Sequence, residues 1–401
     1  MKVMRARNKD RLLFAWVRPQ GQGKRVRRVK SVAIIGTRGY PSYYGGFETA
    51  VRKIAPYLAD HDWDVTVYGR PGSTLDADPE RDPRVHSVRT RGLETKSVST
   101  LSYGLTATWH ALFHKPDVAL VMNVANGYFL PLLRARGIRT IVNVDGIEWD
   151  RAKWGRVAKA VFRAGARATA RFADEIICDS DEIQRRWDRD FGRRGVFIPY
   201  GGDVVAQLPV EPGFQHRGYV LVVARFVPEN TIPEFVEAAA EIARILPVII
   251  VGSSGYGGPL EAQVAQLAEA DPNVTWLGHV SDDRRLLALW QHAAVYFHGH
   301  SVGGTNPTLV QAMAMGTPVV ARDTVYNREV LGANGHFCAP VPSAIHAAVV
   351  ALASDPRAQE KASRDNFARS RESYTWEGVC ASYDEALTAL VEKGPQHAHS
   401  V

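Results

Sequence analysis

Ser31-Val-Ala-Ile-Ile-Gly36 is a short apolar run that ends in glycine, which is typical of a buried parallel strand. A glycine-rich loop follows it, and residues 47–59 then carry apolar side chains at helical spacing. A second apolar run, residues 64–68, also ends in glycine. The order strand, loop, helix and strand predicts the first unit of a doubly wound parallel sheet.

The same alternation continues along the chain and restarts after a polar, glycine-containing stretch at about residues 201–218. The sequence therefore predicts an α/β protein with two Rossmann-like, doubly wound parallel-sheet domains that face each other across a cleft. Further strands are predicted at residues 117–122, 140–144, 174–178, 195–199, 219–223, 247–251, 274–277, 294–297 and 318–321.

The domain boundaries follow from this pattern. We expect a basic tail at residues 1–30, an N-terminal domain at 31–205 and a C-terminal domain at 206–375. Residues 376–401 are expected to form a helix and a tail, with the helix able to pack back on the N-terminal domain.

The 401 residues are 45% hydrophobic and 23% charged, as in an ordinary soluble globular chain. The net charge of +7 comes from the tail, where Lys and Arg are opposed by a single acid, Asp10. The remainder is close to neutral, so nucleic acid is not an expected partner. No apolar run reaches the ~18–20 residues that span a bilayer. We expect a cytoplasmic protein whose tail is either a disordered extension or a basic arm on the inner face of the membrane.

Glycines lie between the first predicted strand and its helix, and two of them, Gly45 and Gly46, come just before the helix. Backbone N–H groups in such a loop can reach an anion, and the helix dipole favours negative charge there. A dinucleotide fingerprint is the obvious rival, but it requires G-x-G-x-x-G and an acid after the next strand. Here the spacing differs and Gly69-Arg70 follows that strand, so NAD is not expected, and the loop is either a phosphate site or a structural turn.

Two carboxylates, Asp145 and Glu148, come directly after the predicted strand 140–144. The carboxyl ends of parallel strands are where α/β proteins place functional groups, and a carboxylate there can orient or deprotonate a substrate hydroxyl. Trp149 offers a ring for stacking. The alternative is a turn or helix cap, because Asp145-Gly146 is also typical turn chemistry.

The second half has a matching loop after strand 294–297. Asn306 can cap a helix that begins with Pro307, and the N–H groups of Gly304, Thr305 and Asn306 would then face an anion. His298 and His300 stand at the end of the strand.

Arg225 follows strand 219–223 and is expected at the same edge of the second sheet, where a guanidinium can pair bidentately with a diphosphate. Residues 151–172 predict a basic amphipathic helix, which is either a surface for anionic membrane or an ordinary solvated face.

These motifs resemble the retaining glycosyltransferases of family 4, which have the GT-B fold, and more narrowly their bacterial rhamnosyltransferase-like subgroup. The resemblance implies a nucleotide-sugar donor in the C-terminal half and a glycan or lipid-linked acceptor in the N-terminal half. The segments that carry it are Ile35-Gly-Thr-Arg-Gly-Tyr-Pro41, Tyr44-Gly-Gly-Phe-Glu48, Val144-Asp-Gly-Ile-Glu-Trp149, Arg151-Ala-Lys-Trp-Gly155, Ala224-Arg-Phe-Val-Pro-Glu-Asn230, His298-Gly-His-Ser-Val-Gly-Gly-Thr-Asn-Pro307 and Tyr326-Asn-Arg-Glu-Val-Leu-Gly332.

Three positions depart from the broader family pattern. Asn230 stands where a Lys is usual, and Gly303 and Gln311 stand where two Glu are usual. Gln311 can still hydrogen-bond a ribose hydroxyl, without charge.

The resemblance then implies a full set of site residues and no metal or cofactor. Catalytic roles are expected for Asp145, Glu148 and Arg225, and acceptor contacts for Tyr44, Asp145, Glu148 and Trp149. Donor contacts are expected for Gly45, Gly46, Arg225, Asn230, His300, Gly303, Gly304, Thr305, Asn306 and Gln311.

The expected function is transfer of a sugar, such as L-rhamnose or another hexose, from a nucleoside diphosphate to an acceptor hydroxyl with retention of configuration. Two alternatives stay open. One is a nucleotide-sugar epimerase of the same fold, and the other is a non-catalytic relative that binds nucleotide sugars or glycans.

Overall fold

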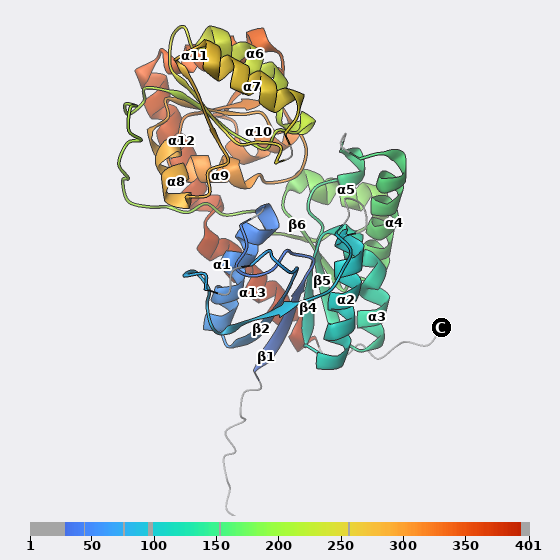
Figure 1. The fold of residues 1–401 in the computed structure, drawn as a ribbon. Helices are drawn as coiled ribbons and strands as arrows, with labels where there is room; N and C mark the ends of the chain where they lie inside the picture. Colours follow the sequence, from blue (N-terminus) through green and yellow to red (C-terminus); the bar gives the residue numbers. More distant parts are fainter. Residues whose placement is uncertain are drawn as a thin grey trace, which may run out of the picture.

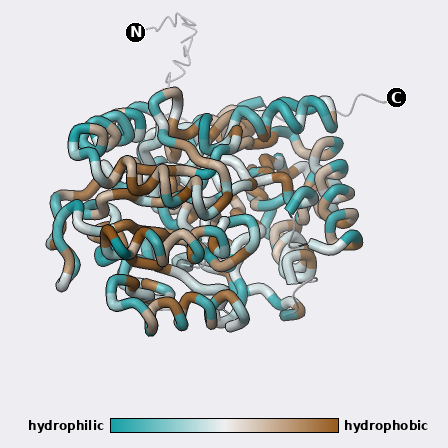
Figure 2. The backbone as a smooth tube through the Cα atoms, turned by 90° about the horizontal axis from the view of Figure 1, so that it is seen from above, coloured by the Kyte–Doolittle hydropathy of each residue, from teal (hydrophilic) through white to brown (hydrophobic). Residues whose placement is uncertain are grey.

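The computed structural model describes residues 29–43, 45–74, 77–94, 99–151, 154–255 and 257–393. Its two α/β domains lie one above the other in Figure 1, and each is built around a parallel sheet. Hydrophobic segments concentrate in the interior of the molecule, whereas the outer helices are largely hydrophilic (Figure 2).

The N-terminal sheet has seven strands in the order β3-β2-β1-β4-β5-β6-β7, and all neighbouring pairs are parallel. The order reverses between β1 and β4, and in such sheets ligands bind outside the carboxyl ends of the strands near the reversal. The strands are β1 (Lys30–Ile35), β2 (Trp63–Gly69), β3 (Val85–Arg89), β4 (Val118–Met122), β5 (Arg139–Asn143), β6 (Glu175–Cys178) and β7 (Val196–Phe197).

Helices cover both faces of this sheet. One face packs against α1 and the other against α2, α3, α4 and α5, because alternate strand residues such as Ile34 and Ile35 enter separate apolar clusters. These elements are α1 (Gly46–Asp60), α2 (Ser99–His114), η1 (Val124–Phe129), α3 (Leu130–Ala135), η2 (Glu148–Asp150), α4 (Arg156–Phe172) and α5 (Asp181–Phe191).

The C-terminal sheet repeats the arrangement with six parallel strands in the order β10-β9-β8-β11-β12-β13. Its strands are β8 (Val220–Val223), β9 (Val248–Val251), β10 (Val274–Gly278), β11 (Val295–His298), β12 (Val319–Arg322) and β13 (His336–Cys338). Its helices are η3 (Pro228–Asn230), α6 (Ile232–Ile242), α7 (Pro259–Ala270), α8 (Asp283–His292), α9 (Pro307–Ala314), α10 (Val325–Leu331), α11 (Pro342–Ala353) and α12 (Pro356–Ser373).

The last helix, α13 (Trp376–Glu392), returns to the N-terminal domain and lies beside α1 (Figure 1). Asn143 Nδ2 donates to the Tyr383 hydroxyl at 2.7 Å, and Trp63 Nε1 donates to Asp384 Oδ1 at 2.7 Å. The chain therefore crosses between the domains twice, which limits how far they can separate. Within the described residues, no helix has both the length and the apolar character needed to cross a bilayer.

The predicted doubly wound sheets are confirmed, and every predicted strand is present within two residues of its expected position. The sequence did not predict the edge strands β3 and β13, nor the helices α2, α3, α5, α7, α8, α10 and α11. The basic tail lies almost wholly outside the described residues.

Candidate active site

The N-termini of α1 and α9 meet at the contact between the domains. A Cβ added at Gly46, the first residue of α1, would lie 3.3 Å from Cγ of Pro307, the first residue of α9. The hydroxyl of Tyr200 lies 3.3 Å from the same point. Helix N-termini carry partial positive charge and free N–H groups, so two of them at one place favour an anion there.

Both helix starts have the local structure that the sequence predicts. Asn306 caps α9, since its side chain accepts a hydrogen bond from Thr308 N at 3.0 Å. Gly45 is the N-cap of α1, and its carbonyl accepts from Thr49 N at 3.0 Å. Glu48, in the first turn of α1, accepts from Arg38 N at 3.0 Å.

The loop after β11 packs on the loop after β5 from the other domain. A Cβ at Gly146 would lie 2.8 Å from the Cα of Gly303, and Gly303 has φ +104, a conformation that strongly favours glycine. The two backbones therefore touch where neither residue carries a side chain. Gly303, which replaces an expected Glu, serves this close approach.

Asp179 lies at the same contact between the domains, and the sequence reasoning did not single it out. It follows β6, is 2% exposed, and its Oδ1 has no hydrogen-bond partner within the described residues. Its carboxyl lies against Gly304, where an added Cβ would be 1.8 Å from Oδ1. Burial, with the Asp145 carboxylate nearby, raises the pKa of Asp179 well above its usual value. The signal was available, because Asp179 comes directly after a predicted strand.

Thr305 contacts Asp179 through both its backbone N–H and its side chain. Thr305 N donates to the Asp179 carbonyl at 3.3 Å, and its hydroxyl donates to the same oxygen. The expectation that the Thr305 N–H faces an anion is therefore not met in this structure.

The carboxylates of the β5 loop have different surroundings. Glu148 is buried, lies 2.6 Å from Arg151 Nε, and accepts from Trp154 Nε1 at 2.8 Å. The Glu148 carboxylate is therefore enclosed by protein partners in this structure, and its contact with an acceptor stays a prediction. Asp145 lies 4.0 Å from Arg151 Nη2 and its side chain is partly exposed, so it remains available to a substrate.

Trp149 is a core residue. It is buried, and its ring centroid lies 6.5 Å from that of Trp187 and 5.7 Å from that of Phe191, both on α5. The ring is therefore largely enclosed by the N-terminal domain in this structure, and the acceptor contact of Trp149 stays a prediction. Tyr44 lies outside the described residues.

Arg225, Asn230 and His300 form one cluster at the carboxyl edge of the second sheet. Asn230 Nδ2 donates to the Arg225 carbonyl at 2.8 Å, and Asn230 Oδ1 is paired with His300 Nδ1. Since an amide oxygen only accepts, this network assigns the hydrogen to Nδ1 of His300. Burial and neighbouring positive charge lower the pKa of His300 well below its usual value, so the ring is neutral at pH 7.

Within this cluster, the Asn230 amide links Arg225 to His300, and its donor contact stays a prediction. Arg225 itself is exposed, and no carboxylate among the described residues forms an ion pair with it. It is thus free to meet an anion.

Gln311 is bound to the interdomain linker. Its Nε2 donates to the Asp203 carbonyl at 2.8 Å and its Oε1 accepts from Asp203 N at 2.9 Å. Each end of the amide therefore has one protein partner in this structure, and the ribose contact stays a prediction. The sequence offered no signal, because Asp203 is 108 residues away.

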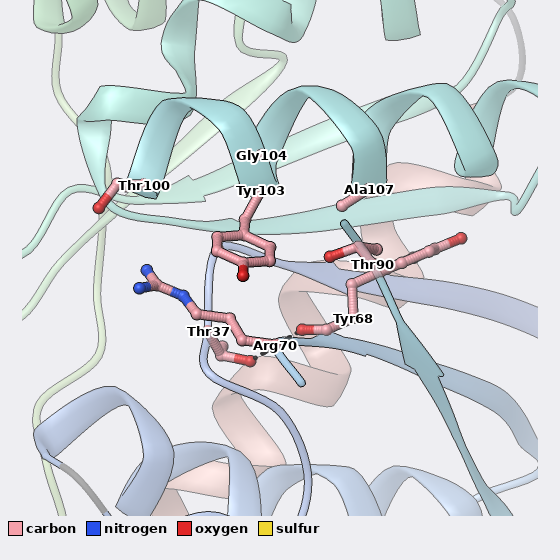
Figure 3. Close-up of a pocket in the computed structure, with 9 residues that line it drawn as sticks. Thr37, Tyr68, Arg70, Thr90, Thr100, Tyr103, Gly104 and Ala107 are labelled. Atoms are coloured by element: carbon pink, nitrogen blue, oxygen red, sulfur yellow. Dashed lines mark hydrogen bonds between the residues drawn. The ribbon is translucent and has the colours of Figure 1, made fainter. Parts of the chain in front are cut away.

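A small pocket lies at the carboxyl ends of β1 and β2, beneath α2 (Figure 3). Tyr103 reaches from α2 toward the sheet, and the Arg70 guanidinium lies 5.0 Å from its ring centroid. Burial, followed by the neighbouring Arg38, lowers the pKa of Arg70, whereas the nearby carboxylates of Glu94 and Glu48 act in the opposite direction. The pocket is lined by Gly36, Thr37, Tyr68, Arg70, Thr90, Thr100, Tyr103, Gly104 and Ala107.

Each of the two domains is similar to a known protein family. Residues 45–201 match a family model described as "Glycosyl transferase 4-like domain", and residues 217–355 match one described as "Glycosyl transferases group 1". Among solved structures, sucrose-phosphate synthase from Thermosynechococcus elongatus superposes with a TM-score of 0.73 at 19% identity, covering 91% of this chain and 100% of that one. The Anabaena protein HepE, solved with UDP and glucose, gives a TM-score of 0.71 at 16% identity, covering 90% and 100%. At such identities these structures establish the fold alone.

Two mycobacterial relatives are similar in sequence. The phosphatidyl-myo-inositol mannosyltransferase of Mycobacterium tuberculosis is 32% identical over 181 residues, which is 42% of this chain and 47% of the relative. The MMP alpha-(1->4)-mannosyltransferase of Mycolicibacterium hassiacum is 26% identical over 203 residues, covering 48% and 49%. The match thus spans about half the length of these curated relatives.

Two facing Rossmann-like domains, with helix N-termini opposed at their contact, define a GT-B protein. Each domain is similar to a glycosyltransferase family model, so the chain has the fold and the two-domain arrangement of GT-B glycosyltransferases of the family 4 type.

Proposed function

We propose that this protein transfers a hexose from a nucleoside diphosphate to a hydroxyl of a glycan or lipid-linked acceptor. The observation that carries the proposal is the meeting of the α1 and α9 N-termini, together with the exposed Arg225 that follows β8 in the C-terminal domain. A departing diphosphate needs preorganised positive charge, and these groups supply it from both domains. The diphosphate then binds between Gly46 and the Gly304–Asn306 loop, after a small separation of the domains.

The acceptor side is the N-terminal domain. Asp145 is the β5-loop carboxylate that stays partly exposed, and its role is to orient the attacking hydroxyl. The pocket that Arg70 lines can take a polar or anionic group of the acceptor, because the guanidinium offers hydrogen-bond donors there.

The sugar and the stereochemistry are finer parts of the proposal. The sequence motifs favour a deoxyhexose such as L-rhamnose, and the names of the curated relatives favour mannose. Retention follows from the family resemblance, with the leaving phosphate taking the acceptor proton and Asp145 holding the hydroxyl in place. The proposed reaction uses no metal or cofactor, since the charge on the diphosphate is met by Arg225 and the helix N-termini.

Calorimetric titration with nucleoside diphosphates tests the donor site. The wild type is expected to bind one of UDP, GDP and dTDP, and Arg225→Ala is expected to lose about 1.5–3 kcal/mol as a charge-assisted contact disappears. Arg244→Ala is the matched control, because Arg244 pairs with Glu241 on the exposed surface. Equal diphosphate affinity in wild type and Arg225→Ala would remove Arg225 from the site.

A further inference from the structure

Helix α2 exposes a stripe of large apolar side chains. Leu105, Trp109 and Phe113 are 45%, 60% and 66% exposed, and their spacing of four residues places them along one side of the helix. The rings of Trp109 and Phe113 pack edge to face at 5.6 Å. The opposite side of α2 is buried against the sheet. A stripe of this kind on a soluble domain marks an interaction surface.

The surface continues onto the neighbouring helices. Arg136 Nε donates to the Leu112 carbonyl at 3.2 Å, which joins the end of α3 to α2. The Tyr128 hydroxyl donates to the Val161 carbonyl at 2.6 Å, which joins η1 to α4. Figure 1 shows α2, α3 and α4 together on one side of the N-terminal domain. Tyr128 on η1, Leu132 on α3 and Val157 on α4 add further exposed apolar side chains.

The charge on these helices has one sign. None of α2, η1, α3 and α4 contains an Asp or Glu. The basic residues of α3, its C-cap and α4 are Arg134, Arg136, Arg156, Lys159, Arg163, Arg167 and Arg171. Apolar side chains flanked by basic ones match the interface of an anionic bilayer, where aromatic rings insert and Lys and Arg meet the headgroups.

We infer that the outer surface of α2, α3 and α4 docks the protein on anionic membrane. A second copy of the chain does not fit, because two such surfaces would bring like charges together. A nucleic acid does not explain the exposed Leu105, Trp109 and Phe113. The same helix α2 lines the Arg70 pocket with Tyr103 and Gly104, so docking would hold that pocket near the lipid headgroups.

Sedimentation with lipid vesicles tests the inference on the full chain, without any assay of activity. Vesicles of phosphatidylcholine with phosphatidylglycerol should bind the protein, and vesicles of phosphatidylcholine alone should bind it weakly. Raising the salt should weaken binding, because charge attraction is screened over a Debye length of ~8–10 Å. The charge-reversed variant Arg163→Glu with Arg167→Glu should bind less, since both residues are exposed on α4.

The aromatic stripe is tested by Trp109→Ser combined with Phe113→Ser, which should lower the partition coefficient at least about tenfold. Trp109→Phe keeps an apolar ring and should retain binding, and Ile245→Ser removes a 52% exposed side chain from the C-terminal domain and should change nothing. Circular dichroism and thermal unfolding check that each variant is folded.

Three results would overturn the inference. The double serine variant could bind anionic vesicles like the wild type, which would assign binding to another part such as the basic tail. The wild type could bind no vesicle. Sedimentation velocity could instead reveal a dimer that the serine variant abolishes, which would make this surface a contact between copies.

Discussion

Gly304→Ala should force the two domains apart or destabilise them, because the new methyl group has no room. Its Cβ would lie 1.8 Å from Asp179 Oδ1 and 2.3 Å from Asp179 Cγ, far inside ordinary contact. Asp179 is buried, so its carboxyl cannot swing into solvent. Overpacking of this kind costs about 1–3 kcal/mol. Asp179→Ala removes the obstacle, so the double variant should recover most of the loss, giving a coupling energy of about 1–3 kcal/mol.

Urea unfolding measures the stability of the two single variants and the double variant, and small-angle scattering measures the radius of gyration in case the domains separate instead. Gly155→Ala is the matched control, since nothing lies within 4 Å of its Cβ and its φ of −70° suits alanine. It should stay within about 0.5 kcal/mol of wild type. Wild-type stability together with a wild-type radius in Gly304→Ala would refute the close contact between Asp179 and the β11 loop.

Three further predictions concern single residues. Asp145→Asn should lower sugar transfer while leaving donor affinity unchanged, and full transfer by a folded variant would contradict the acceptor role. Gln311→Glu should lose about 1–3 kcal/mol of stability, because a carboxylate oxygen would face the Asp203 carbonyl, whereas a ribose ligand would show itself as altered donor affinity in calorimetry. Burial lowers the pKa of His298 to about 3. As the pH falls below about 6.5, the His298 ring therefore takes up a proton in the unfolded chain but stays neutral in the folded one. The free energy of unfolding should then drop by about 1.4 kcal/mol per pH unit toward pH 3. His298→Gln should remove that contribution from the slope of unfolding free energy against pH, and an unchanged slope would exclude it.

The sequence predicted the buried parts of the fold well, because central parallel strands are continuous apolar runs such as Val118–Met122. The edge strand β3 alternates polar and apolar residues over only five positions and gave no clear pattern. Helix α2 was missed because it is apolar on both its buried and its exposed sides, so it lacks the one-sided periodicity of a surface helix.

The parts of the site that were predicted best are the two helix starts, because short-range sequence rules determine where a helix begins. The cap at Asn306 and the glycines before α1 follow from short-range rules, and the structure has the helix starts where these residues put them. The roles of Glu148, Trp149 and Gln311 depend on partners that the chain brings together only by folding. Residue type alone could not separate a substrate ligand from a residue of the protein interior at these positions.

The most direct test of the central claim is to incubate the purified protein with a panel of nucleotide sugars, with and without a lipid and glycan extract, and to measure both the nucleoside diphosphate released and the sugar in the products. The account predicts that one donor releases its diphosphate when acceptor is present, that the sugar appears on the acceptor, and that Arg225→Ala abolishes both signals. A donor sugar isomerised without acceptor, or a donor that binds without turnover across the whole acceptor panel, would contradict it.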